Sequence, residues 1–158
     1  MGGPSGFAAR GAAEASEAQP QRRLNETPRA RGERLLRLID GDKVADNLLR
    51  AYEDVAPDFT RYLVEFAFGE IYAREGDLRQ KELVAIASLA TMGGCDAQLE
   101  THVHGAFNVG LSEREIVEAV MTLIPYAGFP RALNAMAIVK RVVEKRALNA
   151  NEMNEDRR

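Results

Sequence analysis

The sequence predicts an all-α protein built around one compact helical domain. Hydrophobic residues make up 46% of the 158 residues, aromatic residues make up only 6%, and there is no Trp, so aliphatic side chains must fill the core. The apolar residues recur at spacings of three and four rather than in alternation, which is the period of an amphipathic helix. No stretch reads as a convincing strand, and a chain of this length can bury one real core.

The first predicted helices are delimited by turn residues. Two short helices flank Gly41–Asp42, and Pro57 interrupts the chain after the second. Residues 58–74 repeat their apolar positions at helical spacing. Residues 79–92 form a long helix that is apolar nearly all round, so we expect it to be buried on most sides. Gly93–Gly94 ends that helix.

The second half of the chain shows clearer helix ends. A helix over residues 96–109 is expected to stop at Gly110, a C′ glycine. Residues 112–115 read Ser-Glu-Arg-Glu, a capping box that opens the next helix. A Gly-Phe-Pro turn at 128–130 leads into a last helix over 131–145.

Composition divides the chain into an arm, a domain and a tail. Residues 1–29 lack any period, so we expect a disordered N-terminal arm. The helical domain spans residues 30–146, and residues 147–158 form a polar tail that we expect to fray. The apolar faces are too numerous for a lone bundle of this length, which favours a homo-oligomer.

Charge and cysteine content exclude several kinds of partner. The formal net charge is −3, so the chain has no basic excess for binding nucleic acid or an anionic membrane surface. No apolar run approaches the roughly 18 residues that span a bilayer. A single Cys forms no intrachain disulfide, and a lone thiol suits a reducing, cytoplasmic compartment.

The residues best suited to chemistry cluster after Gly93–Gly94. Cys95 stands at the start of a helix, where free N–H groups and the helix dipole stabilise a thiolate. His102 follows seven residues later, and Gln98 lies between them, so the three side chains can line one stripe. His104 points to the opposite side, and no metal-ligand spacing is present.

Glu82 can complete this cluster from the preceding helix. If the Gly93–Gly94 turn folds the two helices antiparallel, Glu82 approaches His102 and fixes its tautomer. Structural roles are open alternatives for each of these residues. Cys95 can be an inert buried side chain, His102 a structural histidine, and Glu82 a carboxylate that satisfies the start of its own helix.

The order of these motifs resembles the carboxymuconolactone decarboxylase family, which is related to the alkylhydroperoxidase D proteins. The resemblance covers about residues 31–146 and is carried by the stretches 68–72, 78–83, 93–99, 102–110, 112–116, 126–130 and 134–135. It implies an all-helical fold, a ring-like trimer or hexamer, and an active site between helices, often at subunit boundaries. It implies no cofactor.

The peroxidase branch of the resembled family uses a Glu, a Cys-x-x-Cys pair and a His four residues after the second Cys. Cys95 matches the first Cys, His102 matches the His, and Glu82 lies one residue away from the expected Glu spacing. Gln98 replaces the second Cys, so the dithiol cycle is broken. A peroxidase cycle that uses Cys95 with an external thiol remains an alternative.

The decarboxylase branch is the better match, through residues 99–108 and 127–130. It implies loss of CO₂ from γ-carboxymuconolactone or a related lactone acid, in which the conjugated lactone itself accepts the electrons. In this interpretation His102 is the acid, Glu82 orients it, and Cys95 is a pocket wall. Gln98 and the cations Arg79 and Lys81 are the candidate substrate-binding residues, with Arg131 ranked below them. A non-catalytic oligomeric binding protein is the third alternative.

Overall fold

The structure is a computed structural model that describes residues 25–155, and these residues contain helices and no strands. The elements are α2 (Pro28–Asp40), α3 (Asp42–Arg50), α4 (Pro57–Tyr62), the π-helix η1 (Leu63–Tyr72), α5 (Leu78–Met92), α6 (Asp96–Asn108), α7 (Glu113–Thr122) and α8 (Ile124–Glu155). The all-α prediction is therefore confirmed. Residues 1–24, most of the expected N-terminal arm, lie outside the described residues.

The N-terminal helices begin and end where local chemistry requires. The Thr27 hydroxyl accepts a hydrogen bond from the Ala30 amide, and Pro28 occupies the first turn of α2, where its missing N–H costs nothing. Gly41 has φ 82°, which ends α2 and lets α3 start at the next residue. Pro57, predicted to interrupt the chain, also opens α4.

The segment predicted to be helical over 58–74 is α4 followed by η1. Its second part has π-helical hydrogen bonding, a rare form that apolar spacing does not reveal. η1 packs closely on α2 through two glycines. A Cβ at Gly32 would stand 2.1 Å from the Val64 carbonyl oxygen, and one at Gly69 would stand 2.3 Å from that of Pro28.

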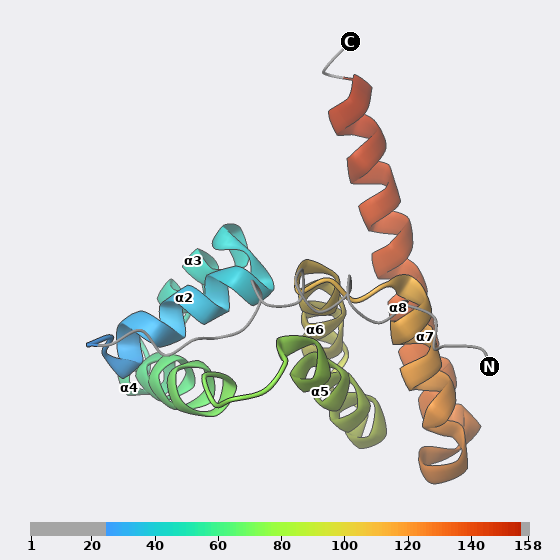
Figure 1. Ribbon diagram of the computed structural model, residues 1–158, viewed down its shortest axis with the longest axis horizontal. Coiled ribbons are helices and arrows are strands. Elements are labelled where there is room, and N and C mark those ends of the chain that lie inside the picture. The colour runs from blue at the N-terminus through green and yellow to red at the C-terminus, as the bar shows by residue number, and fades with distance from the viewer. Residues whose placement is uncertain (1–24, 156–158) are drawn as a thin grey trace, which may run out of the picture.

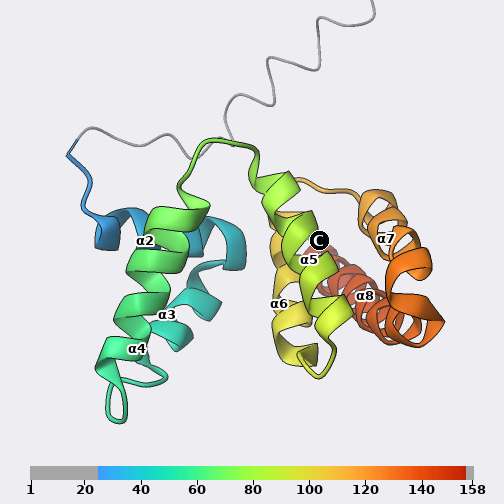
Figure 2. The ribbon, with the colours of Figure 1, turned by 90° about the horizontal axis from the view of Figure 1, so that it is seen from below.

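The helices form two groups that meet at α6. α2, α3 and η1 enclose one core around Leu35, Leu36, Ile39 and Val64, and α5 to α8 enclose the other. Figures 1 and 2 show α2 to α4 on one side and α5, α7 and α8 on the other, with α5 and α6 side by side. The Asn108 side chain joins the groups by donating to the Ile39 carbonyl at 2.8 Å.

The expectation that α5 is buried on most sides is wrong for the single chain. Its buried residues are Leu78, Glu82, Ile86 and Ala90, which recur every fourth position and so form one stripe. On the opposite face Val84 is 66% exposed, because α6, α7 and α8 all contact α5 from the other side.

The ends of α6 and α7 follow the predicted signals. Gly110 has φ 91°, the Leu111 amide donates to the Ala106 carbonyl, and the Gly110 amide donates to that of Phe107, which is a Schellman motif. Ser112 and Glu115 form both hydrogen bonds of the predicted capping box at the start of α7.

The last helix is longer than the sequence predicts. The turn at 128–130 is present as a break at Gly128, with φ 78° and ψ 162°, inside α8. Beyond it the helix continues to Glu155, so the prediction that it ends near Lys145 is wrong. Adding residues to an existing helix costs little, and Ala and Leu favour it. Figure 1 shows this end of α8 projecting away from the other helices.

Candidate active site

An acid–imidazole pair lies between α5 and α6. Gly93 and Gly94, with φ 66° and 71°, reverse the chain between the two helices. Glu82 then faces His102, and Nδ1 of His102 lies 2.9 Å from Oε2 of Glu82. The Glu82 side chain is 0% exposed and the His102 side chain is 23% exposed. The approach of Glu82 to His102 that the sequence predicted is therefore present.

The pair raises the basicity of His102. Burial lowers the pKa of His102, but the hydrogen bond to Glu82 and the charges of Glu82 and Asp40 together outweigh it, so the pKa lies above its ordinary value. Because Glu82 engages Nδ1, Nε2 is the ring nitrogen left for a ligand. A protonated His102 is thus a proton donor held in one orientation.

Two further ionisable groups complete the cluster, and the sequence analysis missed both. Asp40, at the end of α2, is mostly buried and faces His102 and Glu82, and its burial raises its pKa to about 6. Tyr72, in η1, also has a raised pKa, because it is buried and lies near the Glu82 carboxylate. Asp40 is the last residue of α2, before Gly41, and no spacing rule connects α2 to α6.

His102 opens onto a pocket of about 350 Å³. Its polar lining consists of Asp40, Gln98, Thr101, His102 and the phenol of Tyr52, and its apolar lining is Val44, Leu48, Phe59, Leu63, Phe68 and Ala97. Of the predicted stripe of Cys95, Gln98 and His102, only Gln98 and His102 line this pocket. A pocket of this size with an apolar lining and a few polar groups suits a small organic molecule.

Cys95 does not line this pocket. It occupies the N-cap position of α6, half-buried, and its side chain makes no capping hydrogen bond. The guanidinium of Arg131 lies on the turn just before it, since a Cβ at Gly93 would stand 1.5 Å from Nη1 of Arg131. Arg131 is thus beside the α5–α6 turn rather than in the pocket wall.

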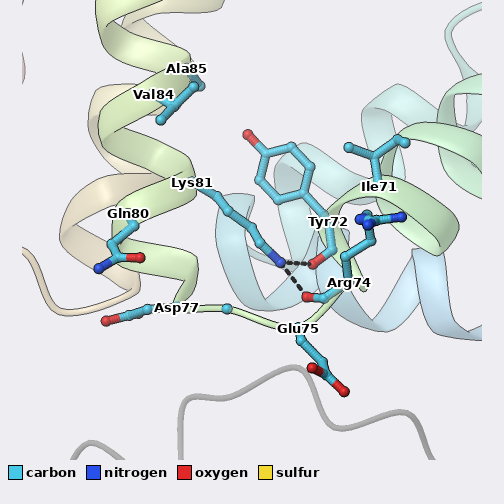
Figure 3. A pocket seen from close by; sticks show the side chains of 10 residues that line it. Ile71, Tyr72, Arg74, Glu75, Asp77, Gln80, Lys81, Val84 and Ala85 are labelled. Carbon is cyan, nitrogen blue, oxygen red and sulfur yellow. Dashed lines mark hydrogen bonds between the residues drawn. The ribbon is translucent and has the colours of Figure 1, made fainter.

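Arg79 and Lys81 also lie away from His102. Arg79 pairs with Glu115 of α7. The Lys81 ammonium donates to the backbone carbonyls of Tyr72, at 2.7 Å, and Arg74, as Figure 3 shows. It lines a second pocket, of about 460 Å³, together with the exposed face of α5. Within the described protomer neither cation lines the His102 pocket.

The site offers protons and hydrogen bonds rather than metal ligands. Among the residues that the structure describes, no three His, Cys, Asp or Glu side chains are grouped to hold a metal ion. His104 stands apart from the cluster, with a pKa lowered by burial and by Arg146 and Lys145. None of the described helices is both long and apolar enough to cross a membrane.

The site of this helical protein is therefore a carboxylate-held imidazole that lies between antiparallel helices and lines a small pocket. The model of the carboxymuconolactone decarboxylase family matches residues 57–141, which include Tyr72, Glu82 and His102. The chain belongs to the carboxymuconolactone decarboxylase family. The resemblance inferred from the sequence motifs is confirmed.

Three relatives illustrate the range of this similarity. The chain is 31% identical over 117 residues to a 4-carboxymuconolactone decarboxylase of Acinetobacter baylyi, covering 73% of this chain and 87% of the relative. It is 33% identical over 110 residues to the nitrosuccinic acid decarboxylase npaB of Metarhizium robertsii, covering 65% and 72%. It is 29% identical over 96 residues to an uncharacterised 15.0 kDa protein of Paracoccus denitrificans, covering 60% and 72%.

Proposed function

We propose that this chain is a cofactor-independent carboxy-lyase that acts on γ-carboxymuconolactone (4-carboxymuconolactone) or a related small carboxylic acid. The observation that carries the proposal is the buried Glu82–His102 pair, which presents a protonatable imidazole to a pocket of about 350 Å³. Two relatives named as decarboxylases support the reaction class.

The chemistry requires an electron acceptor and a proton donor. When the C–CO₂ bond breaks, its electron pair stays on the substrate and must spread into an electron-withdrawing group. A conjugated lactone provides such a group, and so does the nitro group of nitrosuccinic acid. The substrates of both named relatives therefore supply their own electron sink.

His102 supplies the proton in this scheme. Its imidazolium Nε2–H first donates to the developing anion and then transfers the proton to carbon, so CO₂ leaves and a C–H bond replaces the C–C bond. Glu82 holds the ring through Nδ1 and favours the charged imidazolium, which makes it a positioning residue. Gln98, one turn before His102, is the candidate donor to the substrate, because the Thr101 hydroxyl already donates to the Ala97 carbonyl at 3.1 Å.

The alternatives predict different behaviour of Cys95 and His102. No contact in the described protomer favours thiol peroxidase chemistry, since Cys95 lies outside the pocket that His102 lines. A formed pocket beside His102 also counts against a purely non-catalytic binding role. Both alternatives are decided by the assay described below.

Homo-oligomerisation, as a trimer or hexamer, is part of the proposal. Large apolar side chains are exposed on several helices, among them Tyr62, Phe66, Val84, Tyr126 and Phe129. Burying them against further copies would remove this surface from water. Arg79 and Lys81 remain candidate substrate-binding residues in such an assembly, and a cytoplasmic location remains a prediction. Sedimentation velocity measures the assembly, and a monomer at micromolar concentration would contradict it.

The test is CO₂ release from 4-carboxymuconolactone by purified protein without added metal or thiol. His102→Gln is expected to lower kcat by about 10²–10⁴-fold, as loss of a general acid does. His104→Gln, the matched control on the same helix, and Cys95→Ser are expected to keep most of the rate. Equal losses from His102→Gln and Cys95→Ser would contradict the proposed roles. If the wild type releases no CO₂ but consumes peroxide with added thiol, the Cys95 alternative replaces the proposal.

A further inference from the structure

Asp40 is fixed against the acid–imidazole pair by the packing of α2 on α6. The preceding residue, Ile39, is fully buried, and its carbonyl accepts a hydrogen bond from Asn108 of α6 at 2.8 Å. Gly105 of α6 lets the two helices approach. A Cβ there would stand 2.8 Å from Ile39 Cγ2, 3.2 Å from Glu82 Oε2 and 3.4 Å from Asp40 Oδ1. The Asp40 and Glu82 carboxyl groups therefore converge on one point of α6.

The surroundings of Asp40 disfavour a negative charge. Its Oδ1 is buried and has no hydrogen-bond partner within the described residues, and Oε1 of the fully buried Glu82 has none either. Asp40 also ends a helix, where the dipole is negative. These features favour a proton on Asp40, and burial raises its pKa to about 6.

The groups that face Asp40 come from three elements. The charge of Glu82, in α5, raises the pKa of Asp40, and the charge of His102, in α6, lowers it. The charge of Asp40 in turn raises the pKa of Tyr72, in η1. On the other side of the α2–α3 corner, Arg37 pairs with Asp42 and Asp46 and is not paired with Asp40. The pKa of Asp40 is thus set by its burial, which raises it, against the charge of His102, which lowers it.

An anionic ligand in the pocket would shift this balance. Among the described residues that line the pocket there is no Arg or Lys, so a carboxylate entering it meets His102 and Asp40. A ligand carboxylate beside Asp40 makes a negative charge on Asp40 more costly and so favours its protonated form, as in paired carboxylates that share a proton. Asp40 also precedes residues 57–141, the part of the chain that the family model matches.

We propose that Asp40 is a substrate-binding residue that takes up a proton when a carboxylate ligand enters the His102 pocket and then donates a hydrogen bond to that ligand. This inference rests on the proposed function for the nature of the ligand, a small lactone acid. The bound carboxylate then accepts a hydrogen bond from the neutral carboxyl of Asp40, and the nearby His102 imidazolium offsets its charge without giving up the Nε2–H that the proposed reaction uses. Asp40 thereby adds a hydrogen-bond donor for an acid to a pocket whose lining, among the described residues of one chain, holds no Lys or Arg.

The test uses an unreactive probe, the saturated lactone (5-oxotetrahydrofuran-2-yl)acetate, which lacks the carboxyl group that would be lost. Titration calorimetry in buffers of different ionisation enthalpy counts the protons taken up on binding between pH 5.5 and 8. Wild type is expected to take up protons, and its affinity is expected to fall by up to tenfold per pH unit above the pKa of Asp40. Asp40→Asn, which keeps a hydrogen-bond donor without a charge, is expected to bind with affinity that falls less steeply with pH.

Controls separate Asp40 from the other proton carriers. Asp42→Asn, an exposed carboxylate two residues away, is expected to behave like wild type. His102→Gln is expected to keep the part of the proton uptake that Asp40→Asn loses. Difference infrared spectroscopy gives an independent readout, because the band of a newly protonated carboxyl should appear on binding and be absent in Asp40→Asn.

Two results would overturn the inference. One is unchanged proton uptake and an unchanged carboxyl band in Asp40→Asn. The other is failure of the wild-type protein to bind the probe at pH 5.5. The outcome is separable from that of the proposed function, since proton-linked binding without CO₂ release would retain the role of Asp40 and reject the lyase. CO₂ release with pH-independent binding would retain the lyase and reject the role of Asp40.

Discussion

Replacing Glu82 with Gln tests whether the acid–imidazole pair is a charged pair. The change keeps the shape of the side chain and one hydrogen-bond acceptor for His102 Nδ1, but it removes the negative charge. The pKa of His102 should fall, because burial still lowers it while its main opposing partner is gone. The effect on stability must therefore depend on pH.

How the stability loss in Glu82→Gln changes with pH follows from the direction in which the pKa of His102 is shifted. In the wild type the pKa of folded His102 lies above its ordinary value of 6.5. Its contribution to the free energy of unfolding is fully present below about pH 6.5 and is lost as the pH rises through the folded pKa. At pH 5.5 a hydrogen bond between charged groups is replaced by a neutral one, and we expect Glu82→Gln to lose about 1–2 kcal/mol of unfolding free energy. At pH 8.5 the penalty should shrink or change sign, because a fully buried carboxylate with a neutral partner is itself costly.

Urea unfolding at pH 5.5, 7 and 8.5 measures this difference, and NMR titration of the imidazole follows the pKa of His102 directly. Glu118→Gln, an exposed change on α7, is the matched control and should stay within about 0.5 kcal/mol of wild type at each pH. A penalty for Glu82→Gln that is constant with pH, or that grows as the pH rises, would refute the charged-pair interpretation.

Other consequences of the structure can be measured separately. Ser112→Ala removes the capping-box hydroxyl of α7 and should cost about 1 kcal/mol of unfolding free energy in urea; no loss would show that the cap is not stabilising. Gly105→Ala would place a Cβ 2.8 Å from Ile39 Cγ2, so denaturation should show a loss of about 1–3 kcal/mol despite the better helix propensity of Ala. A more stable protein would mean that α2 and α6 are not in close contact. Cys95→Ser should leave CO₂ release nearly unchanged, and a loss comparable to that of His102→Gln would place the thiol in the reaction.

Local signals in the sequence were sufficient for most of the fold. Gly41, Gly110 and the Ser112–Glu115 box each act on the few residues around them, and the structure has helix ends at all three. The approach of Glu82 to His102 was also predictable, because a short glycine turn joins their helices. The helix-end contacts are local, and the Glu82–His102 contact, 20 residues apart, follows from the short turn between two consecutive helices.

The features that the sequence analysis missed depend on longer-range packing. The π-helical form of η1 and the one-sided burial of α5 are set by which helices pack against them, and apolar spacing does not encode that. Asp40 reaches the site because Gly105 lets α2 approach α6, a contact between segments distant in the chain. Likewise, the sequence did not reveal that Arg79 pairs with Glu115 and Lys81 with backbone carbonyls, and the substrate-binding role of both cations stays a prediction.

The most direct test of the account is the pH dependence of kcat/KM for 4-carboxymuconolactone in wild type and in Glu82→Gln. If His102 is the acid and Glu82 raises its pKa, the wild-type rate falls as the pH rises through the pKa of His102. The same descending limb should move to lower pH in Glu82→Gln and match the His102 pKa found by NMR in each protein. A limb that stays in place, or that tracks a group other than His102, would contradict the central claim.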